Sequence, residues 1–210
     1  MAVQQRAEET RGRILSAAVD CFAQRGYDAT SVAELCDCAG VSKGAFYHHF
    51  PTKQSVFLEL LNRWLETLDT GLDDARSGGE NVPDSLRNMA GLAGFIFSAA
   101  GEQLPMFLEF LSQASHDPEV WKATVAPYLK YRDFFAELVR QGIAEGSLRP
   151  VDADMAARAI VSLAMGVILQ GLLDPEGADW GLAMQGGIQM LLLGIAEPAY
   201  TVDSDEKGTT

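Results

Sequence analysis

The sequence predicts an all-α protein, in which an N-terminal three-helix domain is joined by a fourth helix to a C-terminal helical bundle. Apolar residues recur at spacings of three and four along most of the chain, and no long run alternates between apolar and polar residues as a half-buried strand would. Capping residues, glycines and prolines divide this pattern into about nine helices. Hydrophobic residues make up 48% of the 210 residues, which is ample for a buried core.

The first three helices are expected to contain a helix-turn-helix. We place the first helix from Thr10, the expected N-cap, to Gly26. The second begins with a capping box, S-V-A-E at 31–34, in which the serine and the glutamate each satisfy a free backbone N–H group. The turn A-G-V at 39–41 leads to a third helix over about 42–49, capped by its serine. Helix, short glycine-containing turn and helix are the parts of a helix-turn-helix.

Six further helices follow the stop formed by Pro51 and Thr52. They are expected to cover about 53–75, 83–97, 104–114, 117–145, 152–173 and 180–195. The predicted domains are therefore residues 1–55 and residues 56–198. The polar residues 199–210 are expected to form a disordered tail.

The chain carries a formal net charge of -13, but this charge is unevenly distributed. Residues 1–55 contain six basic and six acidic residues, so the net negative charge belongs to residues 56–210. No acidic residue occurs from Cys38 to Leu58, where two lysines and two histidines are present. Because charges separated by more than about 10 Å are largely screened at 0.1 M salt, this acid-free segment can meet phosphate groups although the protein is acidic.

The sequence predicts a cytoplasmic protein without a membrane partner. No N-terminal stretch combines basic residues, an apolar segment and a cleavage site, so no signal peptide is expected. The apolar stretch M-L-L-L-G-I-A at 190–196 is too short to span a bilayer. The odd number of cysteines, without a secretory signal, argues against a disulfide framework.

A metal site is not expected either, although Cys36, Cys38, His48 and His49 lie close in sequence. On a helix, positions 36 and 38 point about 200° apart, so their side chains do not converge on one ion. Strong zinc motifs use C-x-x-C spacings instead. Cys21 lies on an apolar stripe and is expected to be a small core residue.

No catalytic or cofactor-binding motif is found. The chain lacks a nucleophile elbow, a Walker loop, H-E-x-x-H and G-x-G-x-x-G. Two adjacent histidines without a partnered serine or cysteine do not make a catalytic triad. We therefore expect neither an enzyme nor a bound cofactor.

Residues 10–61 contain four recognisable elements: R-x-x-I-L-x-A-A at 11–18, F-A-x-x-G-Y-x-A-T-S at 22–31, A-G-V-S-K-G-x-x-Y-x-H-F at 39–50, and Lys53. With these elements the segment resembles the DNA-binding domain of TetR/AcrR-family transcriptional regulators. The match is ordered over some fifty residues and is highly specific. Cys36 is a departure, because the family usually has alanine there, but it fits the same core position.

The resemblance implies a homodimer whose two third helices enter successive major grooves of DNA. It implies a ligand-binding and dimerisation domain in the rest of the chain, and a repressor released from a palindromic operator by a small apolar or aromatic molecule. The small residues of about 152–196 favour a four-helix dimer interface, although a buried core could have the same composition. The alternative is a helical ligand-binding protein or adaptor without DNA binding, and the intact Lys43, Tyr47 and Lys53 argue against it. Activation in place of repression stays open.

The residue chemistry agrees with DNA binding. Lys43 can reach a base edge or a phosphate, and the methyl group of Ala45 can contact a thymine methyl. Tyr47 and Lys53 look like the family's phosphate-binding tyrosine and lysine. The residues expected to contact DNA are Thr30, Ser31, Ser42, Lys43, Gly44, Ala45, Tyr47, His48, His49 and Lys53. Capping alone also explains the two serines, and His49 could instead bond within the domain.

Six of the ten phenylalanines lie between residues 95 and 135, and with neighbouring side chains they could line a cavity for an apolar or aromatic ligand. The residues expected to bind the ligand are Met89, Phe95, Phe107, Phe110, Trp121, Tyr128 and Phe134. The alternative is that these side chains fill an ordinary core. The expectation of a pocket rests on the family layout.

Overall fold

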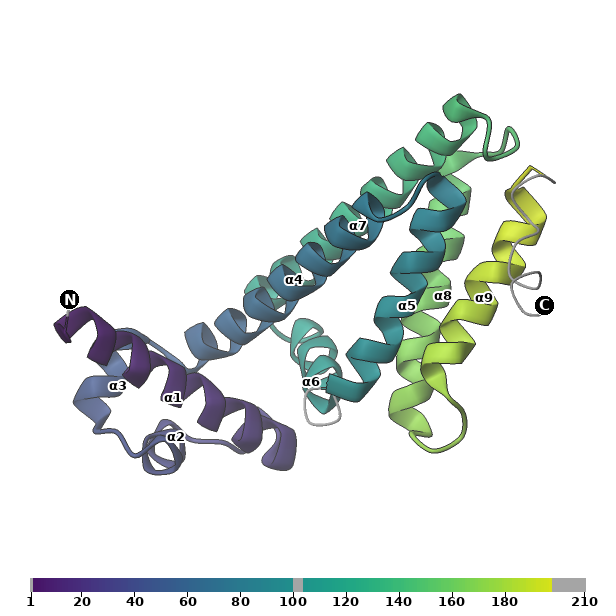
Figure 1. The fold of residues 1–210 in the computed structure, drawn as a ribbon. Coiled ribbons are helices and arrows are strands. Elements are labelled where there is room, and N and C mark those ends of the chain that lie inside the picture. The colour runs from purple at the N-terminus through teal and green to yellow at the C-terminus, as the bar shows by residue number, and fades with distance from the viewer. Residues whose placement is uncertain (1, 100–103, 198–210) are drawn as a thin grey trace, which may run out of the picture. The chain divides into compact units, whose positions relative to one another are not determined.

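The computed structural model describes residues 2–99 and 104–197, and in this part of the chain it contains nine α-helices (Figure 1). The helices are α1 (Ala2–Arg25), α2 (Val32–Ala39), α3 (Lys43–His49), α4 (Lys53–Ser77), α5 (Val82–Ala99), α6 (Leu104–Ala114), α7 (Pro118–Glu145), α8 (Ala153–Leu173) and α9 (Trp180–Ile195). The described residues form no strand beyond one isolated bridge, between Leu148 and Ala196. The all-α prediction is therefore confirmed. The predicted tail lies outside the described residues.

Capping side chains fix the starts of several helices where the sequence predicted them. Ser42 and Asp152 accept hydrogen bonds from backbone N–H groups in the first turns of α3 and α8. Thr10 is the exception, because it lies inside α1 and its hydroxyl donates to the Arg6 carbonyl at 2.9 Å. The first helix thus begins at Ala2, and the prediction of Thr10 as its N-cap was wrong.

The helices form two compact units, each made of two chain segments. Unit 1 comprises Met1–Thr67 and Ala99–Val125, and unit 2 comprises Leu68–Ser98 and Ala126–Thr210. Both α4 and α7 contribute residues to both units. The predicted domains divide the chain once, after residue 55. In the structure, unit 1 also includes a second segment that contains α6.

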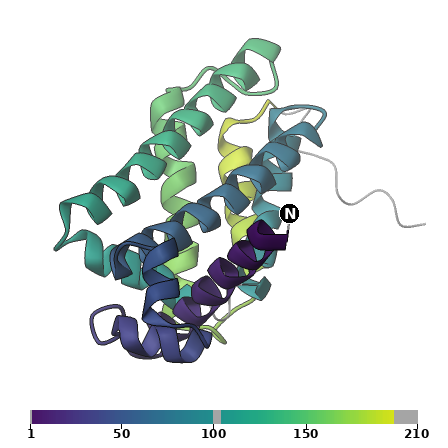
Figure 2. The same ribbon diagram turned by 90° about the vertical axis from the view of Figure 1, so that its left-hand side faces the viewer.

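The core of unit 1 holds the helix-turn-helix together. α1 packs against α2, α3 and α6 (Figure 2). Ile14, Leu35, Phe46 and Phe57 have no exposed surface, and the ring of Phe57 lies 4.3 Å from that of Phe110 on α6. Burial of these four large apolar side chains stabilises unit 1 by about 1.5–3 kcal/mol each.

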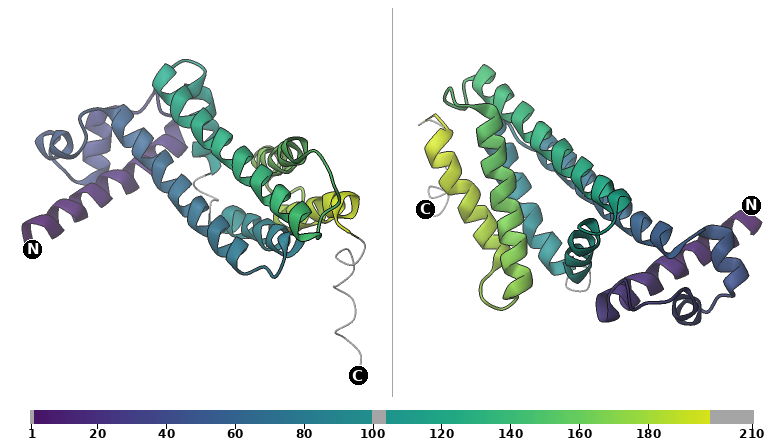
Figure 3. Two further views of the ribbon diagram at one scale, coloured as in Figure 1. Left: turned by 90° about the horizontal axis from the view of Figure 1, so that it is seen from above. Right: turned by 180° about the vertical axis from the view of Figure 1, so that it is seen from behind.

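The core of unit 2 is a helical bundle in which α8 and α9 lie side by side (Figure 3). Gly187 allows this close approach, since a Cβ atom there would lie 2.9 Å from both methyl groups of Leu163. The largest fully buried side chains of this core are Val82, Leu86, Leu138, Val139, Leu148 and Leu192. Within the described residues, α8 alone is long and apolar enough to span a membrane. Core helices of water-soluble folds share this length and composition, so these properties do not by themselves indicate a membrane span.

Candidate DNA-binding site

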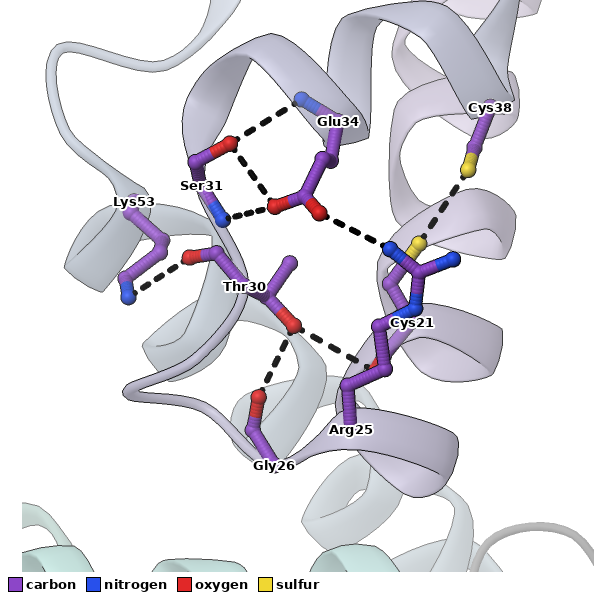
Figure 4. Close-up of polar contacts among 8 residues, drawn as sticks. All are labelled: Cys21, Arg25, Gly26, Thr30, Ser31, Glu34, Cys38 and Lys53. Carbon is purple, nitrogen blue, oxygen red and sulfur yellow. Dashed lines mark hydrogen bonds and ion pairs between the residues drawn. The ribbon is translucent and has the colours of Figure 1, made fainter.

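The start of α2 is fixed by the predicted capping box (Figure 4). The Ser31 N–H donates to Glu34 Oε2 at 2.8 Å, and the Glu34 N–H donates to Ser31 Oγ at 3.2 Å. Arg25, at the end of α1, donates to the other carboxylate oxygen of Glu34 at 2.8 Å. The backbone N–H of Ser31, followed by its hydroxyl, lowers the pKa of Glu34. These contacts join the end of α1 to the start of α2.

The turn between α2 and α3 depends on Gly40. Its φ of 62° and ψ of 41° lie in the left-handed region, where a side chain is unfavourable. The Val41 N–H donates to the Cys36 carbonyl at 3.0 Å and closes the turn. Ser42 then accepts from the Ala45 N–H at 3.1 Å and starts α3. The sequence therefore sets the direction in which α3, which we call the recognition helix, leaves the turn.

The recognition helix buries one side and exposes the other. Phe46 is buried in the core of unit 1, whereas Tyr47 is 53% exposed. Lys43, Gly44 and His48 are also exposed, and Ala45 and His49 are half-buried. The exposed side carries no acidic residue, as the sequence predicts, and combines a lysine, a phenol and imidazoles that can donate to phosphates or bases.

Thr30 differs from the prediction. Only 1% of its surface is exposed, and its hydroxyl donates to the Gly26 carbonyl at 2.8 Å and the Cys21 carbonyl at 3.3 Å (Figure 4). In this structure the Thr30 hydroxyl therefore holds the loop between α1 and α2, and it is not presented to DNA. The adjacent Ser31 is exposed, but its hydroxyl serves the capping box.

Lys53 is also committed to the loop between α1 and α2. Its Nζ donates to the Tyr27 carbonyl at 2.6 Å and the Thr30 carbonyl at 2.8 Å, and it lies 4.1 Å from the centre of the Tyr27 ring. Burial lowers the pKa of the Lys53 ammonium. Two of its three N–H donors are thus used within unit 1, which leaves at most one for a phosphate.

Helix α6 contributes contacts to the loop between α1 and α2 that sequence reasoning missed. Glu109 Oε1 accepts from the Tyr27 N–H at 2.8 Å. Gln113 donates to Asp28 at 3.1 Å in the same loop. These pairs are more than eighty residues apart in sequence, so no local pattern could have indicated them.

The predicted ligand-binding residues are divided between the two units. Phe110 is part of the core of unit 1, where it contacts Phe57, and Trp121 is an exposed residue of the same unit. Met89 and Phe134 belong to the core of unit 2 or pack against it, and Tyr128 is exposed there. The structure therefore assigns Phe110 a core role in the DNA-binding unit, in place of the predicted ligand contact. The side chains of Phe95 and Phe107 lie outside the described residues.

A helix-turn-helix with an exposed, acid-free recognition helix on an all-helical body defines a DNA-binding regulator of transcription. Residues 14–60 match the family model for bacterial regulatory proteins of the tetR family. Residues 98–185 match the model for the C-terminal domain of BetI-type transcriptional repressors. The chain belongs to the TetR family of bacterial transcriptional regulators, as the resemblance predicted.

Relatives with similar lengths support this assignment. The chain is 23% identical to the HTH-type transcriptional regulator UidR of Escherichia coli K12 over 194 residues, which cover 92% of this chain and 96% of UidR. It is 29% identical to the HTH-type transcriptional repressor KstR2 of Mycobacterium tuberculosis H37Rv over 159 residues, or 71% and 75% of the two chains. Both relatives are named as regulators of transcription.

The fold is shared with solved structures. A transcriptional regulator from Saccharomonospora viridis, solved in complex with choline, superposes with a TM-score of 0.79 at 22% identity. The superposition covers 90% of this chain and 99% of that protein. It therefore supports the fold over nine-tenths of the chain.

Proposed function

We propose that this protein is a ligand-responsive repressor that binds a palindromic operator as a homodimer and leaves it when a small molecule binds. The observation that carries the proposal is the exposed side of the recognition helix, where Lys43, Tyr47 and His48 lie in a segment without acidic residues. A helix of this kind fits the major groove, and a dimer presents two such helices. Half-sites centred about 34–36 Å apart follow from this geometry.

An exposed apolar surface on α8 and α9 supports the homodimer. Isolated exposed leucines are normal on soluble proteins, but a cluster on two paired helices is typical of a protein interface. The exposed apolar side chains on these two helices are Met155, Met165, Leu169, Leu173, Leu182, Met190 and Leu193. Two copies of this helix pair would cover each other as a four-helix interface.

Met89 and Phe134, which lie in or against the apolar core of unit 2, support an apolar or aromatic effector. The match to the C-terminal domain of BetI-type repressors, and the choline bound by the Saccharomonospora viridis regulator, support a small organic effector more generally. Choline is therefore a suitable first probe beside apolar compounds. Native mass spectrometry of the protein after incubation with cell extract would identify a bound molecule directly.

The function is tested by selecting DNA from a random-sequence library with the purified protein. We expect enrichment of a near-palindrome, bound with an affinity that falls steeply as salt increases, because Lys43 and its neighbours displace counterions from phosphates. Lys43→Ala should change the preferred base at one position of each half-site if Lys43 contacts a base. Enrichment of no sequence would favour the alternative, a helical ligand-binding protein without DNA binding.

A further inference from the structure

Two thiols lie side by side between α1 and the C-terminal end of α2 (Figure 4). Cys21 lies in α1 and is 5% exposed, and Cys38 lies in the last turn of α2 and is exposed. The Cys21 S–H group donates to the Cys38 sulfur, and the two sulfur atoms are 3.4 Å apart. Neither residue belongs to the predicted DNA-contacting set.

The two sulfurs are in non-bonded contact, so a small movement would bring them to bonding distance. A disulfide has an S–S bond of about 2.05 Å, so the sulfurs need to approach by only roughly 1.3 Å from their 3.4 Å separation. The third cysteine, Cys36, lies in the same helix as Cys38 but is 3% exposed. Cys36 therefore serves as a control for Cys38, because it lies in the same helix but is buried.

We propose that Cys21 and Cys38 form a redox-active pair, which peroxides or small disulfides convert reversibly into an intrachain disulfide that alters DNA binding. Disulfides in the cytosol are usually transient, and they are found in redox sensors more often than as structural links. The effect on DNA rests on the proposed function of the protein. The formation of the disulfide does not.

The exposed Cys38 is the thiol that an oxidant reaches first. Hydrogen peroxide converts the Cys38 thiol to a sulfenic acid and releases one water. The Cys21 sulfur then attacks the Cys38 sulfur, the S–O bond breaks, and the hydroxyl group leaves with the Cys21 proton as a second water. Two thiols and one peroxide thus give one disulfide and two waters, and the two sulfurs together lose the two electrons that the peroxide gains.

The environment of Cys21 shields it from the first of these steps, which is left to the exposed Cys38. Burial, followed by the hydrogen bond to Cys38, raises the pKa of Cys21 to about 11, so this thiol keeps its proton at neutral pH. A protonated buried thiol reacts slowly with peroxide in solution. It stays intact until a sulfenic acid forms on the neighbouring Cys38.

The position of Cys38 connects the disulfide to the recognition helix. Cys38 lies two residues before Gly40, whose left-handed conformation directs the chain into α3. Pulling the end of α2 towards α1 therefore moves the start of the recognition helix relative to the rest of unit 1. A groove-binding helix depends on its register and orientation, so we expect the oxidised protein to bind DNA more weakly.

The disulfide is tested by treating the full-length protein with hydrogen peroxide, blocking free thiols and measuring the intact mass and its peptides. We expect a cross-linked peptide pair containing Cys21 and Cys38 in the wild type and in Cys36→Ala, reversed by dithiothreitol. The exposed Cys38→Ser variant should form no intrachain disulfide. A wild type that instead accumulates sulfinic acid, or cross-links two chains through Cys38, would overturn the pair.

The effect on DNA is measured by fluorescence anisotropy with the selected operator. We expect peroxide to weaken binding about tenfold in the wild type and in Cys36→Ala, within the usual range of coupling between sites, and to leave Cys38→Ser unchanged. Equal affinities of the reduced and disulfide-bonded wild type would refute the regulatory part of the proposal. A reduced wild type that selects no operator would instead refute the proposed function, and the mass measurement would still decide on the thiol pair.

Discussion

Lys43 and Lys53 lie in different environments, although both were predicted to contact DNA. Lys53 Nζ donates to two backbone carbonyls of the loop between α1 and α2, and it lies over the Tyr27 ring. Lys43 is exposed at the first position of the recognition helix. A lysine that donates hydrogen bonds to carbonyls inside a domain contributes to the stability of the fold. An exposed lysine is instead available to bind DNA. Their roles are therefore separable by experiment.

Lys53→Met should lower the free energy of unfolding by about 2 kcal/mol, because it removes charge-assisted hydrogen bonds from two carbonyls. The matched variant Lys43→Met should leave stability unchanged within about 0.5 kcal/mol and should weaken DNA binding, because it removes only an exposed charge. Urea denaturation and operator titration of both variants measure the two effects. A fully stable Lys53→Met protein would show that its ammonium is not needed by the loop.

Glu34 should make stability depend on pH. Its folded-state pKa is lowered, first by the Ser31 N–H, so its ionised form stabilises the fold above the ordinary glutamate pKa of about 4.3. This contribution is lost as the pH falls through the lowered value. Glu34→Gln should therefore be less stable than the wild type at pH 7, with a difference that shrinks at about pH 3.5. A constant difference in urea denaturation at the two pH values would contradict this role.

At the scale of elements, helix ends were predictable and helix partners were not. Ser31, Ser42 and Asp152 cap their helices as the sequence indicated, because capping involves residues only two or three positions apart. The prediction for Thr10 was wrong because a threonine inside a helix can also donate a hydrogen bond to the carbonyl four residues earlier. The place of α6 depends on contacts with residues far away in sequence, such as the one between Phe57 and Phe110.

Glu109 on α6 should hold the loop between α1 and α2 in place. Glu109→Ala removes the acceptor of the Tyr27 N–H, so we expect unfolding to cost about 1–2 kcal/mol less and the Tyr27 amide to exchange faster with solvent. Glu109→Gln keeps an acceptor oxygen and serves as the control. Hydrogen exchange followed by mass spectrometry would show equal protection in all three proteins if the contact carries no weight.

At the scale of the whole molecule, the proposed dimer is tested with a glycine that can accept a side chain. A Cβ atom at Gly186 on α9 would meet nothing within 4 Å. The Gly186→Arg variant should therefore keep the fold of the individual protomer. A charge there should break the proposed interface between α8 and α9 of two copies. Gly91 on α5 is equally open and gives the control, Gly91→Arg. Sedimentation that finds Gly186→Arg still dimeric would place the interface elsewhere.

The proposed release from DNA requires that effector and operator oppose each other. Helix α4 runs from Lys53, which contacts the loop between α1 and α2, into unit 2, so it is a continuous element through which the two can be coupled. An effector shifts the protein away from DNA only by the difference between its affinities for the two conformations. Once the effector is identified, calorimetry should find it bound about 5- to 150-fold more weakly by the operator complex than by the free protein. Equal affinities would exclude release by this molecule, because a ligand that binds both states alike shifts neither.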